Sequence, residues 1–273
     1  MSPLYLFAFI FALASGPPLV EVCSQGDVIQ VRALIITGAD VNAAGDDGET
    51  PLLVAARRGD AELIDLLLAA GARADARRWN GETTLHASVA SGRLKAVDRV
   101  LAAGVPVDAV DSRRAQTALH YAAAEGKVEI VKRLIAAKAT VEALSKGGAT
   151  PLWLAVQGAH AEAAAALIAA GANVNVEGPE TFRPIHLAAR SCNVGLLDTL
   201  LQARPDLSPV VQQRSTALHL AVLQNCLPTV KRLVEAGANI EAADSRGQKP
   251  ADIARRRRLK DIAAFFDERT PKP

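Results

Sequence analysis

Five histidines and three cysteines are the residues of this 273-residue chain whose chemistry would matter most. Clustered His, Cys and acidic side chains can bind a metal ion, and a His beside a nucleophile can act as a base. Four histidines occupy one slot, three residues after the start of a repeating motif: His86, His120, His186 and His219. A fixed slot in several copies indicates a structural role, in which each imidazole bonds the backbone of the preceding loop and orients the turn. His160 lies outside this slot and is expected at the surface.

The cysteines predict neither a metal site nor a disulfide. Cys23, expected to pack in the first helix, Cys192 and Cys226 are too few and too scattered for a zinc cage or a disulfide scaffold. Cys192 and Cys226 fall in adjacent copies of the motif at nearly equal phase. Neighbouring helices lie about 8–10 Å apart, whereas a disulfide needs Cα atoms within about 7 Å, so we expect no bridge.

Other catalytic signatures are missing from the sequence. It contains no phosphate-binding loop, no nucleophile elbow and no zinc-protease motif. We therefore predict no catalytic residue, no cofactor and no metal ion, and we expect that the protein is not an enzyme.

The motif that carries the histidines recurs along nearly the whole chain. Its starts lie 33 or 34 residues apart, near residues 17, 50, 83, 117, 150, 183, 216 and 249. In one copy, Thr50 suits a helix N-cap, Pro51 suits the first turn, and Gly59 suits the helix end. Asp60 then begins a second helix with apolar residues at helical spacing, which Gly71 ends. Copies of two short helices and an extended turn must stack to bury their apolar faces.

This motif resembles the ankyrin repeat. The resemblance rests on residues such as Gly48, Thr50-Pro51, Gly59, Leu67-Leu68, Gly71-Ala72 and the copy ending Gly171-Ala172-Asn173-Val174-Asn175. It covers residues 17–269 and implies an all-α solenoid of about eight helix–turn–helix units with β-hairpin-like fingers and atypical terminal caps, followed by a tail at 270–273. It further implies a non-enzymatic scaffold, expected to be a monomer, that binds another protein through its concave face and finger tips.

Several copies depart from the motif where the backbone must turn left-handed. The first-helix Gly is replaced by Ala159, Cys192, Asn225 and Arg258, and the copy that starts at residue 183 has Arg204-Pro205 instead of the second Gly. Residues other than Gly and Asn tolerate this conformation poorly, so we expect the copy at 183 to be distorted or less stable. One copy is a residue longer, and we place the insertion near 107–111. The last copy, ending in Phe265-Phe266, is predicted to be a C-terminal cap.

Residues 4–14 form an uninterrupted apolar run within a separate N-terminal segment, residues 1–16. They are too few to span a membrane, which takes about 20 residues. The run and the Ala12-Leu13-Ala14 site fit a cleaved signal peptide, but no Lys or Arg precedes them. The alternative is an apolar helix that caps the first copy. A cytoplasmic location is slightly favoured, and an exported protein, periplasmic or secreted, with an extracytoplasmic partner is the alternative.

Charge and surface positions favour a protein partner. The 31 basic and 29 acidic residues give a formal charge of +2, which argues against a surface made for nucleic acid. The run Arg255–Arg258 is interpreted as a solvated helix end, and a nuclear localisation or phosphate-binding patch is the alternative. Finger tips and first-helix ends should stay exposed, so the predicted partner-binding residues are Asp46, Asp47, Arg57, Arg58, Trp79, Asn80, Arg113, Arg114, Gln116, Lys146, Gln157, Phe182 and Arg190. For Trp79 and Phe182, packing within the finger is an equal alternative.

Overall fold

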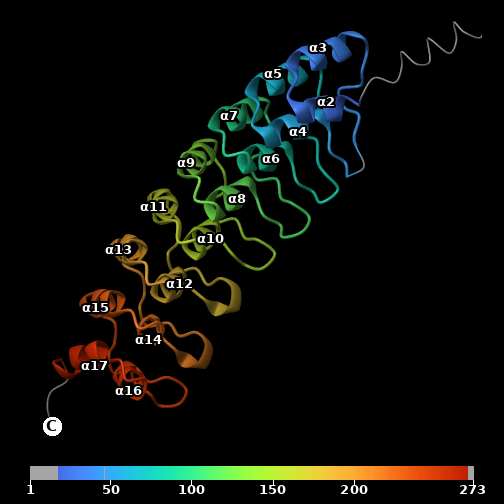
Figure 1. The fold of residues 1–273 in the computed structure, drawn as a ribbon. Coiled ribbons are helices and arrows are strands. Elements are labelled where there is room, and N and C mark those ends of the chain that lie inside the picture. Colours follow the sequence, from blue (N-terminus) through green and yellow to red (C-terminus); the bar gives the residue numbers. More distant parts are fainter. Residues whose placement is uncertain (1–17, 46, 270–273) are drawn as a thin grey trace, which may run out of the picture. The chain divides into compact units, whose positions relative to one another are not determined.

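A computed structural model describes residues 18–45 and 47–269. Its regular elements are α-helices in eight consecutive pairs (Figure 1). The first three pairs are α2 (Leu19–Gln25) with α3 (Val28–Ile36), α4 (Pro51–Arg58) with α5 (Ala61–Ala69), and α6 (Thr84–Ala90) with α7 (Leu94–Ala102). The next five are α8 (Ala118–Ala124) with α9 (Val128–Ala136), α10 (Pro151–Gln157) with α11 (Ala161–Ala169), α12 (Pro184–Ser191) with α13 (Val194–Gln202), α14 (Ala217–Leu223) with α15 (Leu227–Glu235), and α16 (Pro250–Arg256) with α17 (Lys260–Asp267).

The loops between pairs form the fingers. Among the described residues their only β-type pairings are isolated bridges, such as Arg77 with Thr83, and no strand is formed. Two fingers contain a 3₁₀ turn, η1 (Pro179–Thr181) and η2 (Gln212–Arg214). The predicted all-α repeat fold with hairpin-like fingers is therefore confirmed.

The chain divides into two compact units, residues 1–118 and 119–273. In unit 1 the first helices α2, α4 and α6 pack in one row, and the second helices α3, α5 and α7 pack in another (Figure 1). Unit 2 repeats this plan, with α10, α12, α14 and α16 in one row and α9, α11, α13, α15 and α17 in the other. Within each unit, neighbouring pairs therefore bury their apolar faces against one another, as the motif requires.

Local signals in the motif set the helix bounds. The Leu53 N–H donates to the Thr50 hydroxyl at 3.4 Å, and the Leu63 N–H donates to the Asp60 carboxylate at 3.1 Å. Both bonds satisfy amides that would have no partner inside the helix. Gly59 ends α4 in the left-handed conformation with a φ of 72°. The boundaries predicted from capping chemistry therefore match the structure.

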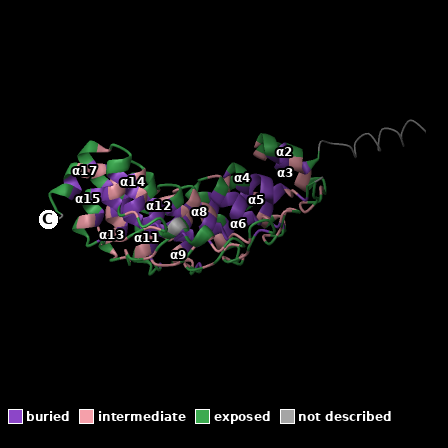
Figure 2. Ribbon diagram, turned by 90° about the horizontal axis from the view of Figure 1, so that it is seen from below, coloured by how far each residue is buried: buried purple, intermediate pink, exposed green. Residues whose placement is uncertain are grey.

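Small and aliphatic side chains fill the space between helices. Ala55 and Ala56 of α4 are fully buried and allow the first helices to approach closely, while Leu63, Ile64 and Leu67 of α5 are fully buried beneath them. Figure 2 shows the same concentration of buried residues on α4 and α5. Each large apolar side chain buried in this way contributes about 1.5–3 kcal/mol.

The copies that lack glycine keep the left-handed turn. Ala159, Cys192, Asn225 and Arg258 have φ values of 60°, 57°, 56° and 60°, and Arg204 has a φ of 53°. The helices of the copy at residue 183 remain eight and nine residues long. The fold therefore imposes the turn on unfavourable residues, and the lower stability of this copy stays a prediction.

The extra residue of the long copy lies at the finger tip, slightly beyond the segment 107–111 where we placed it. In the preceding finger the Arg78 N–H donates to the Glu82 carbonyl, four residues on, whereas here the Asp111 N–H reaches Gln116, five residues on. Residues 112–115 therefore hold the insertion. The buried Asp111 carboxylate accepts from two tip amides at 2.7 and 2.8 Å, which stabilises the longer tip.

The last pair packs its aromatic residues inward. Phe266 is fully buried, and the Arg269 guanidinium lies 3.8 Å from the centre of the Phe265 ring. Lys260, Asp261 and Asp267 of α17 are exposed, as expected for a terminal cap with a polar surface. The predictions for the segment 1–16, the tail 270–273 and Asp46 concern residues outside the described ranges. In 18–45 and 47–269 no helix has the length and apolarity needed to cross a membrane.

Candidate partner-binding site

Backbone hydrogen bonds join the three fingers of unit 1. The Trp79 N–H donates to the Asp47 carbonyl at 3.2 Å, and the Ser112 N–H donates to the Asn80 carbonyl at 2.8 Å. These bonds fix the register of neighbouring tips. They bring together five of the predicted partner-binding residues, namely Asp47, Trp79, Asn80, Arg113 and Arg114.

Trp79 is the most prominent apolar group on these tips. Its side chain is 76% exposed, and among the described residues no acceptor is bonded to its indole N–H. A Cβ on residue 48 would lie 2.7 Å from Cδ1 of Trp79, so the ring needs glycine beneath it. Trp79 also lines a pocket of about 510 Å³ between two fingers, together with Asn42, Arg73 and Arg77. The indole therefore lies close to Gly48 and remains available to a partner.

Three acidic residues of the described tips in unit 1, Asp47, Glu49 and Glu82, are already paired inside the molecule. Arg78 forms ion pairs with Asp47 and with Glu82, and the hydrogen bond from Arg78 holds the pKa of Asp47 below its usual value. Arg57 pairs with Glu49 at 2.8 Å. Arg78 was missed in the sequence, because its pairing with Asp47 depends on the register between the fingers, and its place beside Trp79 was the one signal in the sequence.

The arginines of the third finger lack such partners. Arg113 and Arg114 are exposed, and neither lies within ion-pairing distance of a carboxylate in the described part of the chain. Arg58 is also exposed, and it donates to the Ser24 carbonyl. Gln116 is half-buried, and its carbonyl accepts from His86. Among the described residues of these tips and first-helix ends, the charge that remains after internal pairing is positive.

Unit 2 places its predicted residues differently. Lys146, Gln157 and Arg190 are exposed, but Phe182 is only 7% exposed. Its ring packs edge-on against His186 with 6.1 Å between centroids, and the Arg190 guanidinium lies 5.0 Å from its centre. Of the two alternatives for Phe182, the structure shows packing, so its ring is not an exposed binding group.

The repeated histidines are structural, but they bond the following finger and not the preceding one. Nε2 of His86, His120, His186 and His219 lies 2.9–3.1 Å from the carbonyls of Gln116, Ala149, Pro209 and Gln248. The direction differs because the imidazole points along the stack, away from the loop that leads into its own helix. In the copy at residue 150, which has no histidine in the slot, Trp153 Nε1 donates to the Phe182 carbonyl at 2.9 Å.

Burial favours the neutral form of three of these imidazoles. It lowers the pKa of His86, His186 and His219, and the backbone hydrogen bonds oppose this effect only in part. In His86, Nδ1 accepts from the Thr83 N–H at 3.3 Å while Nε2 faces a carbonyl. The neutral ring with its proton on Nε2 satisfies both bonds. His160, expected at the surface, is half-buried and lies 3.1 Å from the Ala124 carbonyl.

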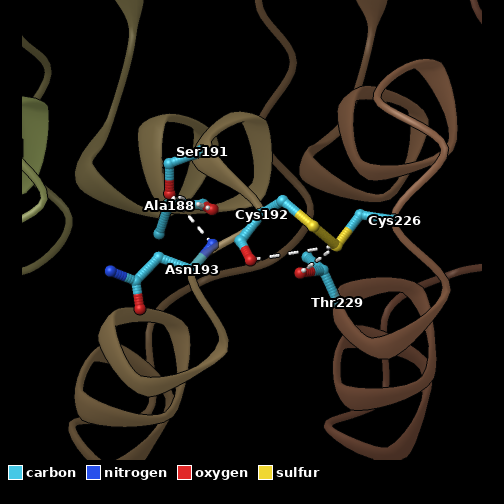
Figure 3. The surroundings of a disulfide bond; sticks show 6 residues. All are labelled: Ala188, Ser191, Cys192, Asn193, Cys226 and Thr229. Carbon is cyan, nitrogen blue, oxygen red and sulfur yellow. Dashed lines mark hydrogen bonds between the residues drawn. A yellow bond between two sulfur atoms is a disulfide. The ribbon is translucent and has the colours of Figure 1, made fainter.

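Cys192 and Cys226 form a disulfide, which corrects the expectation from the sequence (Figure 3). Their Cα atoms are 5.8 Å apart, closer than the 8–10 Å between helix axes. The two cysteines are 34 residues apart, which is one more than the repeat length. Counted within its own copy, Cys226 therefore lies one position later than Cys192. Thr229 Oγ1 lies 3.2 Å from Cys226 Sγ.

The same offset produces close contacts elsewhere in both units. A Cβ on Gly59 would lie 2.5 Å from Arg93 Cδ, and one on Gly126 would lie 2.4 Å from His160 Nδ1. In these copies the residue that precedes the second helix (Arg93, His160 or Cys226) therefore lies close to the turn of the preceding copy. The helix spacing does not set this distance, which is why the estimate from helix axes failed.

The remaining reactive groups offer no further site. Burial raises the pKa of the Cys23 thiol to about 12, so it is neutral at physiological pH. No group of three His, Cys, Asp or Glu side chains suited to a metal ion is found in the described residues. In the basic run, Arg255 pairs with Asp252 and Asp267, and the exposed Arg257 donates to the Leu223 carbonyl. These contacts fit the interpretation of a solvated helix end.

Comparisons with known proteins match the architecture. A family model for ankyrin repeats in three copies matches residues 19–111 and 94–178, and a second ankyrin-repeat model matches residues 200–254. The crystal structure of the human ASB11 ankyrin repeat domain superposes with a TM-score of 0.71 and 25% identity, covering 82% of this chain and 99% of that one.

Curated relatives match over shorter stretches. Human diacylglycerol kinase iota is 29% identical over 102 residues, 36% of this chain and 10% of the kinase. The chicken nuclear factor NF-kappa-B p105 subunit is 32% identical over 105 residues, 37% of this chain and 11% of that subunit. This chain thus spans about a tenth of the length of these relatives, so only the repeats are shared.

Ankyrin repeats generally mediate protein–protein interaction, and their fold is typically a non-enzymatic interaction domain. The repeat models together match well over half of the residues. The chain belongs to the ankyrin repeat family.

Proposed function

We propose that this protein is a monomeric, non-enzymatic scaffold that binds a protein partner through the finger tips and first-helix ends of unit 1. The observation that carries the proposal is Trp79, whose indole is 76% exposed on a backbone fixed by its neighbours. An exposed Trp held in place loses little conformational freedom on binding, and Trp and Arg are the types enriched at interface hot spots. The adjacent pocket provides room for an apolar side chain of the partner.

The charge of this surface favours an acidic partner segment. Asp47, Glu49 and Glu82 already take part in internal ion pairs, in which Arg57 and Arg78 balance two of their three charges. Arg113 and Arg114 stay unpaired among the described residues and exposed to solvent. Arginine binds carboxylates with two parallel hydrogen bonds, so acidic side chains on either side of an apolar anchor would complement these tips. In unit 2, we assign Lys146, Gln157 and Arg190 to a second contact with a protein partner.

Affinity capture with the full-length chain tests this site. A variant with Trp79→Ala, Arg113→Glu and Arg114→Glu should lose at least about tenfold in partner recovery, because anchor and charges are removed together. A matched control carries Glu62→Lys and Lys95→Glu, which change exposed charges on α5 and α7, and should keep the partner. Equal recovery by the triple variant and the wild type would refute the site. Recovery of nucleic acid in place of protein would refute the class of partner.

The alternative is an exported scaffold with an extracytoplasmic partner. The Cys192–Cys226 disulfide supports it, because disulfides persist mainly in oxidising compartments. Intact mass and N-terminal sequencing of the protein from its native host discriminate the two. A mature start near Ser15 would indicate export, and a retained Met1 or Ser2 would remove the evidence for a cleaved signal.

A further inference from the structure

The outward face of α3, the second helix of the first pair, is apolar. Ile29 is 83% exposed and Ile36 is 79% exposed. They are seven residues apart, so both lie on one side of the helix, with the exposed Ala33 between them. These three residues thus form an apolar stripe in contact with solvent, and the exposed Arg32 lies beside it.

The other seven second helices serve as internal controls for these positions. The residues equivalent to Ile29 are all exposed, and they are Glu62, Lys95, Glu129, Glu162, Gly195, Pro228 and Asp261. Those equivalent to Ile36 are also exposed, and they are Ala69, Ala102, Ala136, Ala169, Gln202, Glu235 and Glu268. Only α3 among these eight helices carries a large aliphatic residue at either position. The apolar face is therefore a property of this pair and not of the fold.

A third position of α3 also differs from the other second helices, and here α3 has a polar residue where they have mostly apolar ones. Gln30 is exposed, whereas its equivalents in the other seven second helices are buried: Leu63, Ala96, Ile130, Ala163, Leu196, Thr229 and Ile262. The polar residue suits the free end of a stack, where no further pair follows. The isoleucines lie instead at positions that face solvent in every pair, where large aliphatic side chains stay exposed unless something covers them.

We propose that the apolar segment 4–14 of this chain covers the stripe formed by Ile29, Ala33 and Ile36. All eleven residues of the segment are apolar, and four of them are aromatic. Apolar side chains would be removed from water on both surfaces, which favours the association. The proposal is independent of partner binding at Trp79.

Chain length and connection fit this occupant. Two residues, Gly26 and Asp27, join α2 to α3, so the start of α2 lies beside the end of α3 that carries Ile36. Residues 15–17 can span about 10 Å from the start of α2. Eleven residues extend about 16 Å as a helix, while Ile29 and Ile36 are about 10 Å apart along α3. The segment therefore reaches the stripe and is long enough to cover it.

Carbene footprinting of the wild-type full-length chain tests the cover without any change to α3. Labelling of Ile29 and Ile36 should be several-fold lower than in a full-length variant with Phe7→Ser, Phe9→Ser and Phe11→Ser. Trp79, which is 76% exposed, is the internal reference and should label equally in both proteins. Equal labelling of the isoleucines in both proteins, or a mature chain that starts near Ser15, would overturn the proposal.

A double-mutant cycle provides the energetic test. Ile36→Glu should lower the folding equilibrium constant of the full-length chain at least about tenfold, because the charge would be buried. In the Phe7, Phe9 and Phe11 variant the same substitution should have little effect. Ala69→Glu, at the equivalent exposed position of α5, is the control and should be near neutral in both backgrounds.

The cycle also identifies other occupants of the stripe. Additive effects would overturn the cover by this segment. So would a dimer in sedimentation that Ile36→Glu converts to a monomer, which would assign the stripe to a second copy. Binding to phosphatidylcholine vesicles that Ile36→Glu abolishes would assign it to a lipid surface and would equally overturn the proposal.

Discussion

Trp79 in unit 1 and Phe182 in unit 2 are both finger aromatics, yet Trp79 is 76% exposed and Phe182 is 7% exposed. Their positions within the finger differ. Trp79 lies four residues before Thr83, at the tip, whereas Phe182 directly precedes Arg183, at the base. At the base, the carbonyl of Phe182 accepts a hydrogen bond from the indole N–H of Trp153 in the preceding copy. Position in the finger, more than residue type, decides whether an aromatic ring can meet a partner.

The same two regions differ in how closely they follow the motif. The copies at residues 50 and 83 have Thr at the helix N-cap and Gly at the left-handed turns. The copy at residue 183 has Arg183 at the N-cap and forces Cys192 and Arg204 into left-handed backbone. It also carries the disulfide and the Arg190–Phe182 contact. Added links therefore occur where the motif is weakest, and the following predictions test whether they compensate for it.

Loss of the disulfide should have the largest effect. The bridge closes a loop of 34 residues, for which unfolded-state entropy predicts about 4 kcal/mol. Cys192→Ser should lower the free energy of unfolding of the oxidised protein by about this amount in urea titrations followed by circular dichroism. Cys192→Gly should lose about 1 kcal/mol less, because glycine relieves the left-handed strain at a φ of 57°.

Reducing conditions turn this into a sharper comparison. With excess reductant, the disulfide is absent from both proteins, and they differ only in the backbone strain at residue 192. Cys192→Gly should then be more stable than the wild type by about 1 kcal/mol. Gly59→Ala in unit 1 is the reverse control, because it introduces a side chain at the equivalent turn. A wild type that stays more stable than Cys192→Gly after full reduction would contradict the compensation.

Substitution of the two aromatics should separate stability from binding. Phe182→Ala should cost about 3 kcal/mol, because it removes a buried ring that packs on His186 and Arg190. Trp79→Ala should change the free energy of unfolding by less than about 1 kcal/mol while weakening partner capture. Thermal unfolding and affinity capture of both variants check this. If the two substitutions lowered the free energy of unfolding equally, the proposed difference between the tip and the base of the finger would be wrong.

The features that depend on neighbours in sequence could be predicted. Thr50 and Asp60 cap the helices as expected, and Gly59 turns left-handed, because each of these roles is decided within one turn of chain. The repeat period then required a stack, since a single pair cannot bury its own apolar face. The fold followed from these local rules.

The sequence did not predict the contacts between neighbouring copies of the repeat. The Cys192–Cys226 bridge and the direction of the histidine bonds both follow from a lean of side chains along the stack, which the period alone does not reveal. Trp153 occupies the histidine slot and could have been identified by its position after Thr150. For the candidate site, the sequence identified Trp79 but not Arg78, because ion pairing depends on the register between fingers.

Acidification should destabilise both regions through the buried histidines. Burial lowers the folded-state pKa of His86 in unit 1 and of His186 and His219 in unit 2. Below about pH 6.5 the unfolded chain therefore binds more protons than the folded protein. The stability they confer is present above that pH and is lost as the pH falls through the folded-state values. Imidazole NMR titrations and urea unfolding at pH 7.5 and 5.5 measure the effect, and rings that titrate above pH 6.5 would contradict it.

Arg204→Gly should have the smallest effect and the opposite sign. Arg204 adopts a φ of 53° at the turn where most other copies have glycine, such as Gly71 and Gly237. Glycine removes the steric cost of this conformation, about 1 kcal/mol, so the free energy of unfolding should rise by about that amount. Arg73→Gly, two residues after the left-handed Gly71 in unit 1, is a control that should not stabilise the protein. If Arg204→Gly fails to stabilise the protein, the departures at this copy are not strained, and the disulfide has nothing there to compensate.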